Sequence, residues 1–375
     1  MKILYLKTED PAISHLCYFD PIAEKPIHND FLHDTLLIGL RNNFGFDVID
    51  YPGAWYMYTE ERKKRKDFTT EKFWGKLFTL YDSLENFNLI NREDIKNKIK
   101  KNFFDLIIYG SIRGENLFLE EAINSKSKII FVDTSDDGAI DLKKVNKLEG
   151  CCGVKLFAGS STGNLLVKDE KDIEKVISNS SKVVAIHSED EDILNIRKKF
   201  IKKGDVNSHP IWRNEECAMS STRRVVKIAE RYNKKIHVLH VTTKEEVEFL
   251  SRYKGNVTFE ITPQHLTISA PQCYKLLGSL AQMNPPIREK KHQDMLWKAV
   301  KDSVVDTIGS DHAPHSLENK KKEYPQTPSG MPGVQTLVPL MLNHINNNRL
   351  TLNQFIKLVC ENPVRIFGIK NKGYI

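Results

Sequence analysis

Four residues in the second half of the chain have types and positions suited to binding a metal ion. Lys155 lies inside a short apolar run, and His187, His240 and Asp311 each follow one closely. Amide hydrolysis needs an activated water, and a divalent metal held by imidazole and carboxylate ligands supplies it. In a barrel of parallel strands such ligands come from the ends of different strands and are therefore far apart in the sequence. The spacing predicts a hydrolytic metal site.

Each of these residues also has an ordinary structural explanation. A histidine at a strand end is more often a hydrogen-bonded structural residue than a ligand. A lysine within an apolar strand can extend its ammonium to solvent instead of burying it, which would be costly without a partner. The occurrence of all four residues in one order favours the metal site over four separate structural roles.

The same residues lie in a series of short segments with a constant order. These segments are VKLFAGSSTG (154–163), AIHSED (185–190), HVLHVTT (237–243), EITPQHL (260–266), MNPPIR (283–288), SDHAPH (310–315), SGMPGVQT (329–336) and ENP (361–363). In order and spacing they resemble the dihydroorotase branch of the amidohydrolase superfamily, over about residues 140–375. The strings DHAPH and GSSTG favour dihydroorotase over the related allantoinases and hydantoinases, which remain an alternative.

The resemblance implies a role for each matching residue. Lys155 would be carboxylated and its carbamate would bridge zinc ions, of which the site would hold one or two. His187 and His240 would bind one metal ion. Asp311 would bind the other and act as the general base, passing a proton to the leaving amide nitrogen. The substrate's carboxylate and ring would be held by Asn284, His315 and the backbone of Gly330.

Other histidines in the matching segments receive weaker assignments. His237 and His265 are expected to be structural or to support the ligands, and the role of His312 is left open. The reaction implied is the reversible interconversion of dihydroorotate and N-carbamoyl-aspartate, a step of pyrimidine biosynthesis.

The elements that must position these residues are parallel strands alternating with helices. Strands are predicted at 153–157, 183–188, 236–241, 257–262 and 306–310, and helices at 170–178, 191–203, 219–233 and 291–301. This alternation indicates part of a (β/α)₈ barrel over residues 141–375. Residues 1–140 predict a separate Rossmann-like βα segment of unknown role, with apolar strands at 3–6, 47–51, 104–109 and 128–133 and helices at 35–42, 92–101 and 116–125.

The first segment lacks a feature that the family carries. Dihydroorotases have a His-x-His pair at the end of the first barrel strand, followed by an arginine that binds the substrate carboxylate. Residues 1–140 contain only His15, His28 and His33, and none has this spacing. We therefore expect the family's first strands, and the strands of its small C-terminal sandwich, to be absent, and activity to be impaired.

Two alternatives follow from this departure. The chain could be a catalytically silent homologue that acts as a binding or assembly partner of an intact amidohydrolase. The pattern of strands and helices in the first segment resembles the N-terminal lobe of Rossmann-type glycosyltransferases, without a shared motif. This segment could instead bind a nucleotide sugar. Tyr109-Gly110-Ser111 follows a strand and could receive a ligand at its carboxyl end, but a plain turn into the next helix is the favoured interpretation.

Composition narrows the class of protein. The chain has 375 residues, 40% apolar and 28% charged, with a net charge of +7 made of lysines scattered among nearly as many acids. The basic run at 62–66 has no interleaved aromatic residues, which favours a solvated face over a nucleic-acid site. Six cysteines without a CxxC pair predict a reducing compartment. We expect a cytoplasmic enzyme without nucleic-acid or membrane partners, which could form a homo-oligomer.

Overall fold

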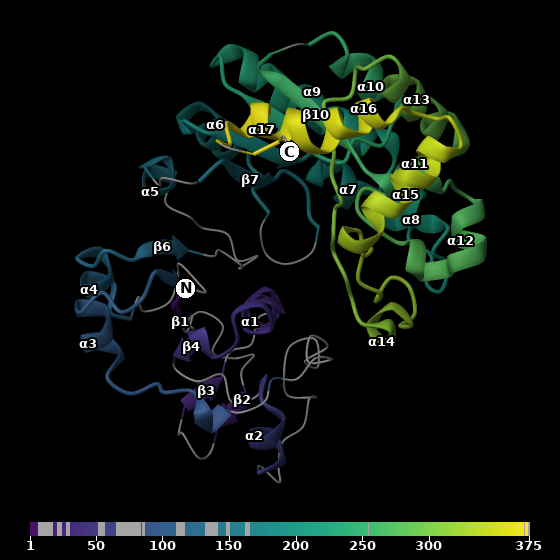
Figure 1. Ribbon diagram of the computed structural model, residues 1–375. Helices are drawn as coiled ribbons and strands as arrows, with labels where there is room; N and C mark the ends of the chain where they lie inside the picture. The colour runs from purple at the N-terminus through teal and green to yellow at the C-terminus, as the bar shows by residue number, and fades with distance from the viewer. Residues whose placement is uncertain are drawn as a thin grey trace. The chain divides into compact units, whose positions relative to one another are not determined.

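The computed structural model divides into two compact units, Met1–Ser135 and Asp136–Ile375 (Figure 1). The described residues are 1–6, 18–20, 25–27, 31–51, 57–64, 84, 87–109, 117–131, 142–147, 151–161, 166–253, 255–370 and 372–373. His15 and His28, and the turn from Gly110, lie outside them.

The first unit is built on a parallel sheet with the strand order β4-β1-β5-β6. The strands are β1 (Ile3–Leu6), β4 (Val48–Tyr51), β5 (Leu106–Tyr109) and β6 (Lys128–Phe131). The helices that accompany them are α1 (Phe31–Phe44), α2 (Thr59–Lys63), α3 (Ile95–Lys100) and α4 (Leu119–Ile123). A short antiparallel pair, β2 (Tyr18–Asp20) and β3 (Lys25–Ile27), is also present. β1 is buried at every position, as expected for an inner strand covered on both faces.

The second unit contains a parallel sheet with the strand order β11-β10-β9-β8-β7. Its strands are β7 (Gly153–Phe157), β8 (Val183–His187), β9 (Ile236–Val238), β10 (Val257–Ile261) and β11 (Thr307–Ile308). All are joined in sequence order, as in consecutive strands of a (β/α) barrel. The predicted fold class, a parallel α/β barrel portion preceded by a Rossmann-like βα sheet, is confirmed.

One face of this sheet carries polar side chains and the other apolar ones, because the register of the strands aligns residues of the same kind. Lys155 is paired with Ala185, Ala185 with His237, and His237 with Thr258, so these side chains share one face. The neighbouring row, Val154, Val184, Ile236 and Val257, is apolar and points to the other face. The polar face corresponds to the interior of a barrel, and the apolar face is the one that helices must cover.

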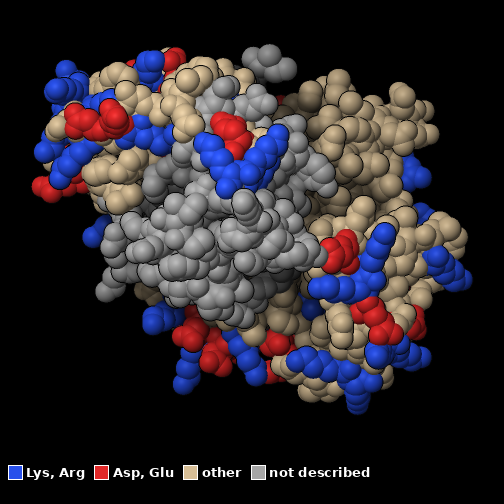
Figure 2. Space-filling model, turned by 90° about the horizontal axis from the view of Figure 1, so that it is seen from below, with Lys and Arg blue, Asp and Glu red and all other residues tan. Residues whose placement is uncertain are grey.

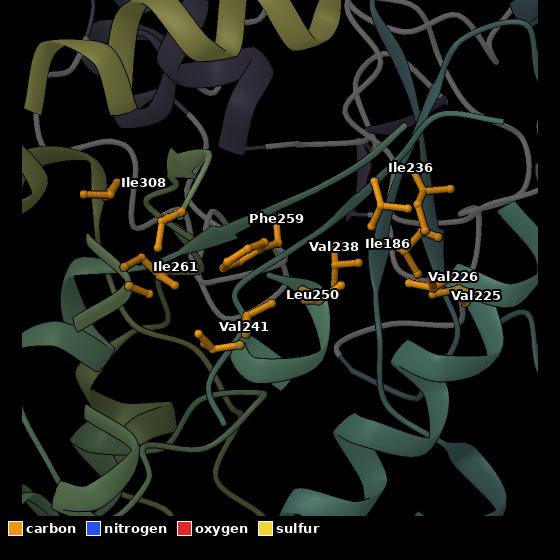
Figure 3. Close-up of a cluster of buried hydrophobic side chains, with 14 of the residues drawn as sticks. Ile186, Val225, Val226, Ile236, Val238, Val241, Leu250, Phe259, Ile261 and Ile308 are labelled. Carbon is orange, nitrogen blue, oxygen red and sulfur yellow. The ribbon is translucent and has the colours of Figure 1, made fainter. Parts of the chain in front are cut away.

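Helices cover the apolar face and form the core of the second unit. The core includes Ile186, Val225, Val238 and Phe259, which lie between strands and helices in Figure 3. The four helices that supply most of the helical side chains are α6 (Glu170–Asn179), α9 (Glu215–Arg231), α10 (Lys244–Leu250) and α13 (Lys290–Lys301). Burial of these branched aliphatic side chains stabilises the sheet and fixes the direction in which its strand ends point.

The remaining α-helices lie in the connections between these elements. They are α5 (Leu142–Lys147), α7 (Glu191–Arg197), α8 (Ser208–Trp212), α11 (Pro263–Thr267), α12 (Gln272–Leu277), α14 (Leu317–Lys320), α15 (Val334–Asn346), α16 (Leu352–Ile356) and α17 (Asn362–Phe367). None of the described helices is long and apolar enough to cross a membrane. Acidic side chains lie among the basic ones on the described surface shown in Figure 2.

Two predicted strands are three residues shorter in the structure than expected, whereas the others differ by at most two among the described residues. The run 236–241 forms a strand only to Val238, and the run 306–310 only at Thr307–Ile308. In each case the chain leaves the extended conformation at a residue with positive φ, His240 (φ 36°) and Asp311 (φ 41°). Apolar character alone does not report this change of backbone direction.

Candidate metal centre

Two histidines meet at the carboxyl ends of neighbouring strands. His187 is the last residue of β8, and His240 follows β9 by two residues. Nδ1 of His187 lies 3.0 Å from Nε2 of His240, and both side chains are buried. Burial is the main cause that lowers the pKa of each ring, and the proximity of His187 lowers that of His240 further. Both imidazoles are therefore held in the neutral form, which has a lone pair to donate to a metal.

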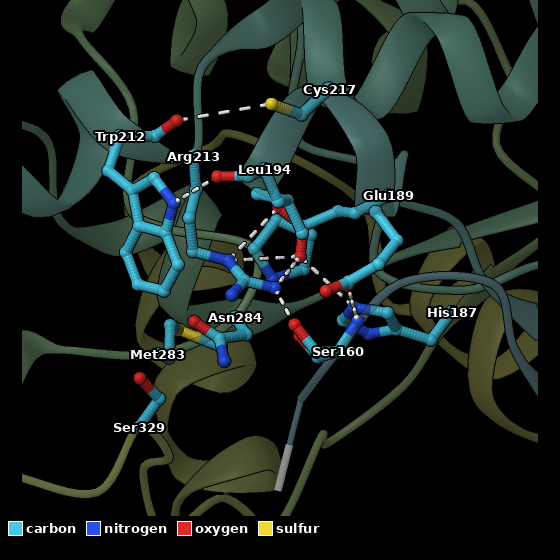
Figure 4. Close-up of polar contacts among 12 residues, drawn as sticks. Ser160, His187, Glu189, Leu194, Trp212, Arg213, Cys217, Met283, Asn284 and Ser329 are labelled. Carbon is cyan, nitrogen blue, oxygen red and sulfur yellow. Dashed lines mark hydrogen bonds and ion pairs between the residues drawn. The ribbon is translucent and has the colours of Figure 1, made fainter. Parts of the chain in front are cut away.

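A buried ion pair supports His187 from the opposite side. Glu189 Oε2 lies 3.0 Å from Nε2 of His187, and the same carboxylate contacts the guanidinium of Arg213 through Nε, 3.2 Å from each oxygen, and through Nη2 (Figure 4). Burial alone would raise the pKa of Glu189, but Arg213 and His187 outweigh it and lower the pKa well below its usual range. An ionised carboxylate accepts the Nε2 proton of His187, which leaves Nδ1 as the acceptor that faces Nε2 of His240 at 3.0 Å.

Lys155 contributes a positive charge near this pair. It lies in β7 on the polar face, with an exposed side chain whose Nζ is 4.6 Å from the centre of the Phe157 ring. After burial, its ammonium is among the causes that lower the pKa values of His187 and His240. It also acts on Asp311, where burial raises the pKa to about 6 and Lys155 opposes this rise. Lys155 is thus electrostatically coupled to each of the other three predicted ligands.

Backbone conformation sets His240 and Asp311 apart from ordinary strand-end residues. Both have a positive φ, which a residue with a side chain adopts at a cost of about 1–3 kcal/mol. Such conformations are found where surrounding structure enforces them, often at functional sites. After His240 the chain enters α10 through the Thr243 capping box, in which Thr243 Oγ1 accepts from the backbone N–H of Glu246 at 3.1 Å. The cap anchors the loop that carries the histidine.

The three predicted substrate-binding residues lie on adjoining loops. The backbone N–H of Gly330 donates to the carbonyl of Gln282, two residues before Asn284, at 2.9 Å. Nε2 of His315 lies 3.1 Å from the carbonyl oxygen of Ser329. Asn284 Oδ1 lies 3.0 Å from Nε2 of His209, which also contacts the carbonyl oxygen of Met283 at 3.0 Å.

The remaining histidines of the matching segments have protein partners. His237 Nδ1 is 2.8 Å from Thr258 Oγ1, and His265 Nδ1 is 2.7 Å from Thr262 Oγ1, as expected for structural residues. His312, whose role the sequence left open, accepts from the backbone N–H of Gly333 at 2.9 Å and of Val334 at 3.2 Å. It caps the start of α15.

Three members of this network were missed by the sequence analysis. Glu189 stands two residues after His187, and a carboxylate so close to a predicted ligand was a usable signal. His209 in α8 and Arg213, which joins α8 to α9, had none, because they lie outside the segments that resemble the family. Only folding brings them to the strand ends.

The described residues fit a metal ion in part. Nδ1 of His240, the ring nitrogen that does not face His187, is buried without a hydrogen-bond partner among them, and a buried polar atom in this state is commonly met by a water or an ion. Two neutral imidazoles that face each other suit zinc. Within the described part of the chain, however, no group of three or more His, Cys, Asp or Glu side chains is arranged to hold a metal. Lys155 is a residue type that contributes a ligand only after carboxylation.

Known proteins resemble this chain in sequence and in fold. No protein-family model matches it. The dihydroorotase of Methanosphaera stadtmanae is 32% identical over 206 residues, 53% of this chain and 47% of that protein. The dihydroorotase of Methanosarcina mazei is 32% identical over 273 residues, 68% of this chain and 59% of that protein. The chain therefore spans about half the length of the curated relatives it matches.

These comparisons extend the similarity beyond the matching segments. The share aligned with the Methanosarcina mazei protein is larger than residues 140–375 make up, so part of it precedes residue 140, where no motif of the family was found. Among solved structures, the L-hydantoinase (dihydropyrimidinase) of Arthrobacter aurescens has a TM-score of 0.60 and 24% identity over 74% of this chain and 67% of that chain. This likeness concerns the fold.

Proposed function

We propose that this chain, a homologue of dihydroorotases over part of its length, is a zinc-dependent hydrolase of cyclic amides that interconverts dihydroorotate and N-carbamoyl-aspartate. The observation that carries the proposal is the pair of buried, neutral imidazoles of His187 and His240, 3.0 Å apart at the ends of neighbouring parallel strands. Sequence similarity to dihydroorotases supports the choice of substrate.

Under this proposal, different residues of the chain bind the metal, transfer the proton and bind the substrate. One or two zinc ions would be held by His187, His240, Asp311 and a carboxylated Lys155, and would supply an activated water. Asp311 accepts the proton of the attacking water and delivers it to the amide nitrogen as the ring opens. Asn284, His315 and the backbone of Gly330 hold the substrate.

A catalytically silent homologue is the second candidate. It is favoured by the lack of a three-residue metal group in the described part of the chain and of a His-x-His pair in residues 1–140. Such a protein would keep the fold and bind an intact amidohydrolase subunit. For the active candidate, the lack of the His-x-His segment with its following arginine in residues 1–140 leads us to expect turnover at least about a hundredfold below that of an intact relative.

Metal binding and turnover separate the two candidates. Zinc affinity would be measured by equilibrium dialysis for the wild type, His187→Ala and the control His344→Gln. His344 is a buried histidine of α15 that contacts Thr267 and lies outside the proposed site. The proposal expects zinc binding that His187→Ala weakens and His344→Gln leaves unchanged. Equal zinc affinity in all three proteins would refute the metal site.

Ring opening of dihydroorotate with added zinc tests the reaction itself. Asp311→Asn removes the base and serves to exclude a contaminating enzyme. Slow turnover that is lost in Asp311→Asn supports the proposal, whereas zinc binding without any turnover favours the silent homologue. Preferred opening of hydantoin or dihydrouracil would assign the chain to the hydantoinase type instead.

A further inference from the structure

Lys320 is a buried lysine outside the predicted ligand set. It is the last residue of α14, a short helix that Ser316 caps, and it is 6% exposed. A lysine is seldom buried to this extent unless its ammonium has partners. The partners of this ammonium indicate what it does.

Three backbone carbonyls accept hydrogen bonds from Nζ of Lys320. They belong to Gln282 at 3.1 Å, Pro328 at 3.0 Å and Gly330 at 3.1 Å. An ammonium has three N–H donors, so these bonds use all of them. Lys320 therefore joins the segment before Asn284 to the segment that contains Gly330.

Additional contacts show that these two segments form one assembly. The Gln282 side-chain amide donates to the carbonyl of Thr327 and to Oγ of Ser329, each at 3.0 Å. Gly330 has a φ of +145°, and a Cβ there would lie 2.4 Å from the carbonyl oxygen of Ala313, so it is packed tightly against the loop after β11. A small shift of the Gly330 carbonyl would therefore be transmitted to the neighbouring His315.

We propose that Lys320 is a positioning residue, whose ammonium holds Gln282, Pro328 and Gly330 together so that Asn284, Gly330 and His315 form one binding surface for the cyclic substrate. The assignment of those three residues rests on the proposed function. Lys320 itself makes its bonds to the backbone and does not touch the reacting atoms under this proposal.

The charge state of Lys320 gives the proposal a pH signature. Burial lowers its pKa to about 8. Above that pH the neutral amine has two N–H groups for three carbonyls, so one of the bonds is lost. His315 is near enough to be affected by Lys320, but its pKa is lowered from 6.5, first by burial and then by Lys320, so it titrates in a separate range.

Three variants of the full chain test the proposal. Lys320→Met keeps the length of the side chain without its donors, Lys320→Arg keeps a charge that does not titrate near pH 8, and Lys321→Met changes the exposed neighbour. Affinity for dihydroorotate is measured by calorimetry between pH 6.5 and 9.5. Hydrogen exchange of the peptide that contains residues 327–331 and zinc affinity are measured in parallel.

We expect Lys320→Met to weaken dihydroorotate binding by about tenfold or more and to speed exchange of the 327–331 amides, with unchanged zinc affinity. The wild type should bind more weakly above pH 8, and Lys320→Arg should lack this step. Lys321→Met should match the wild type. Wild-type affinity and exchange in Lys320→Met would overturn the proposal.

Failure of the proposed function is a separate outcome. If the wild type binds no dihydroorotate at any pH, the substrate assignment is wrong, and with it the part of this proposal that concerns binding. Faster exchange of residues 327–331 in Lys320→Met would then leave the lysine a purely structural clamp, and unchanged exchange would remove that role too.

Discussion

Removing Arg213 from its ion pair with Glu189 should lower the free energy of unfolding of the second unit. Arg213 is 2% exposed and Glu189 is fully buried. The guanidinium donates to both carboxylate oxygens of Glu189 and also to the carbonyl of Ser160 at 2.7 Å. Arg213→Met keeps an apolar chain of similar reach and removes every one of these bonds. After the change, Glu189 keeps its contact with His187 but has lost the cation that balances its charge.

The expected loss is large because the carboxylate stays buried. Breaking a buried ion pair by removing one partner costs about 3–5 kcal/mol. For a unit of this size, each 1 kcal/mol lowers the melting temperature by about 2–4 °C, so the shift should be about 6–20 °C. The double variant Arg213→Met/Glu189→Gln removes the uncompensated charge and should recover part of this loss.

Urea denaturation followed by hydrogen exchange of the β8 and β9 amides measures the second unit by itself. Arg231→Met is the matched control, because Arg231 pairs with Glu174 at 2.7 Å with its side chain 52% exposed. That surface pair should contribute at most about 1 kcal/mol. If Arg213→Met cost no more than Arg231→Met, or if the double variant were less stable than the single one, our account of the buried pair would be refuted.

Three further changes have defined outcomes. Gly39 is exposed in the middle of α1 and a Cβ there would meet no atom within 4 Å, so Gly39→Ala should stabilise the first unit by about 1 kcal/mol, measured by urea denaturation; a loss of stability would contradict this. Thr351→Ala removes the capping box that Thr351 forms with Gln354 at the start of α16, and should cost about 0.5–2 kcal/mol in the same assay, whereas an unchanged midpoint would show that the cap is dispensable. The pKa of His209 is lowered from 6.5 to about 3, first by burial and then by Arg213. Since the unfolded chain takes up this proton at higher pH than the folded chain, the free energy of unfolding should fall as the pH drops from 6.5 towards 3. The slope should be up to about 1.4 kcal/mol per pH unit, and smaller in His209→Gln; equal slopes would exclude His209 as a cause.

Local patterns were sufficient to predict most of the fold. The strand at Ile3–Leu6 and the helix that begins near Lys291 were found because apolar periodicity reports which residues a strand or helix buries. The parallel pairing of the strands in the two larger sheets follows from the alternation of strands and helices, whereas the order β4-β1-β5-β6 of the first sheet does not. The pairing of His187 with His240 was anticipated only as a common strand-end location, and the roles of Lys155, Asp311, Asn284, His315 and Gly330 remain predictions.

Contacts between distant segments required the tertiary structure. Glu189 and Arg213 are 24 positions apart, and Lys320 is 38 positions from Gln282, with no motif to connect either pair. The contact of Glu189 with Arg213 depends on where α8 ends and α9 begins, and that of Lys320 depends on where α14 ends. The partners of Lys320 are backbone carbonyls, which every residue type carries, so the sequence gives no signal for them. The sequence by itself determined which faces of the strands and helices are apolar. Packing of those faces decided which buried charges meet, because burial makes an unpaired charge too costly to keep.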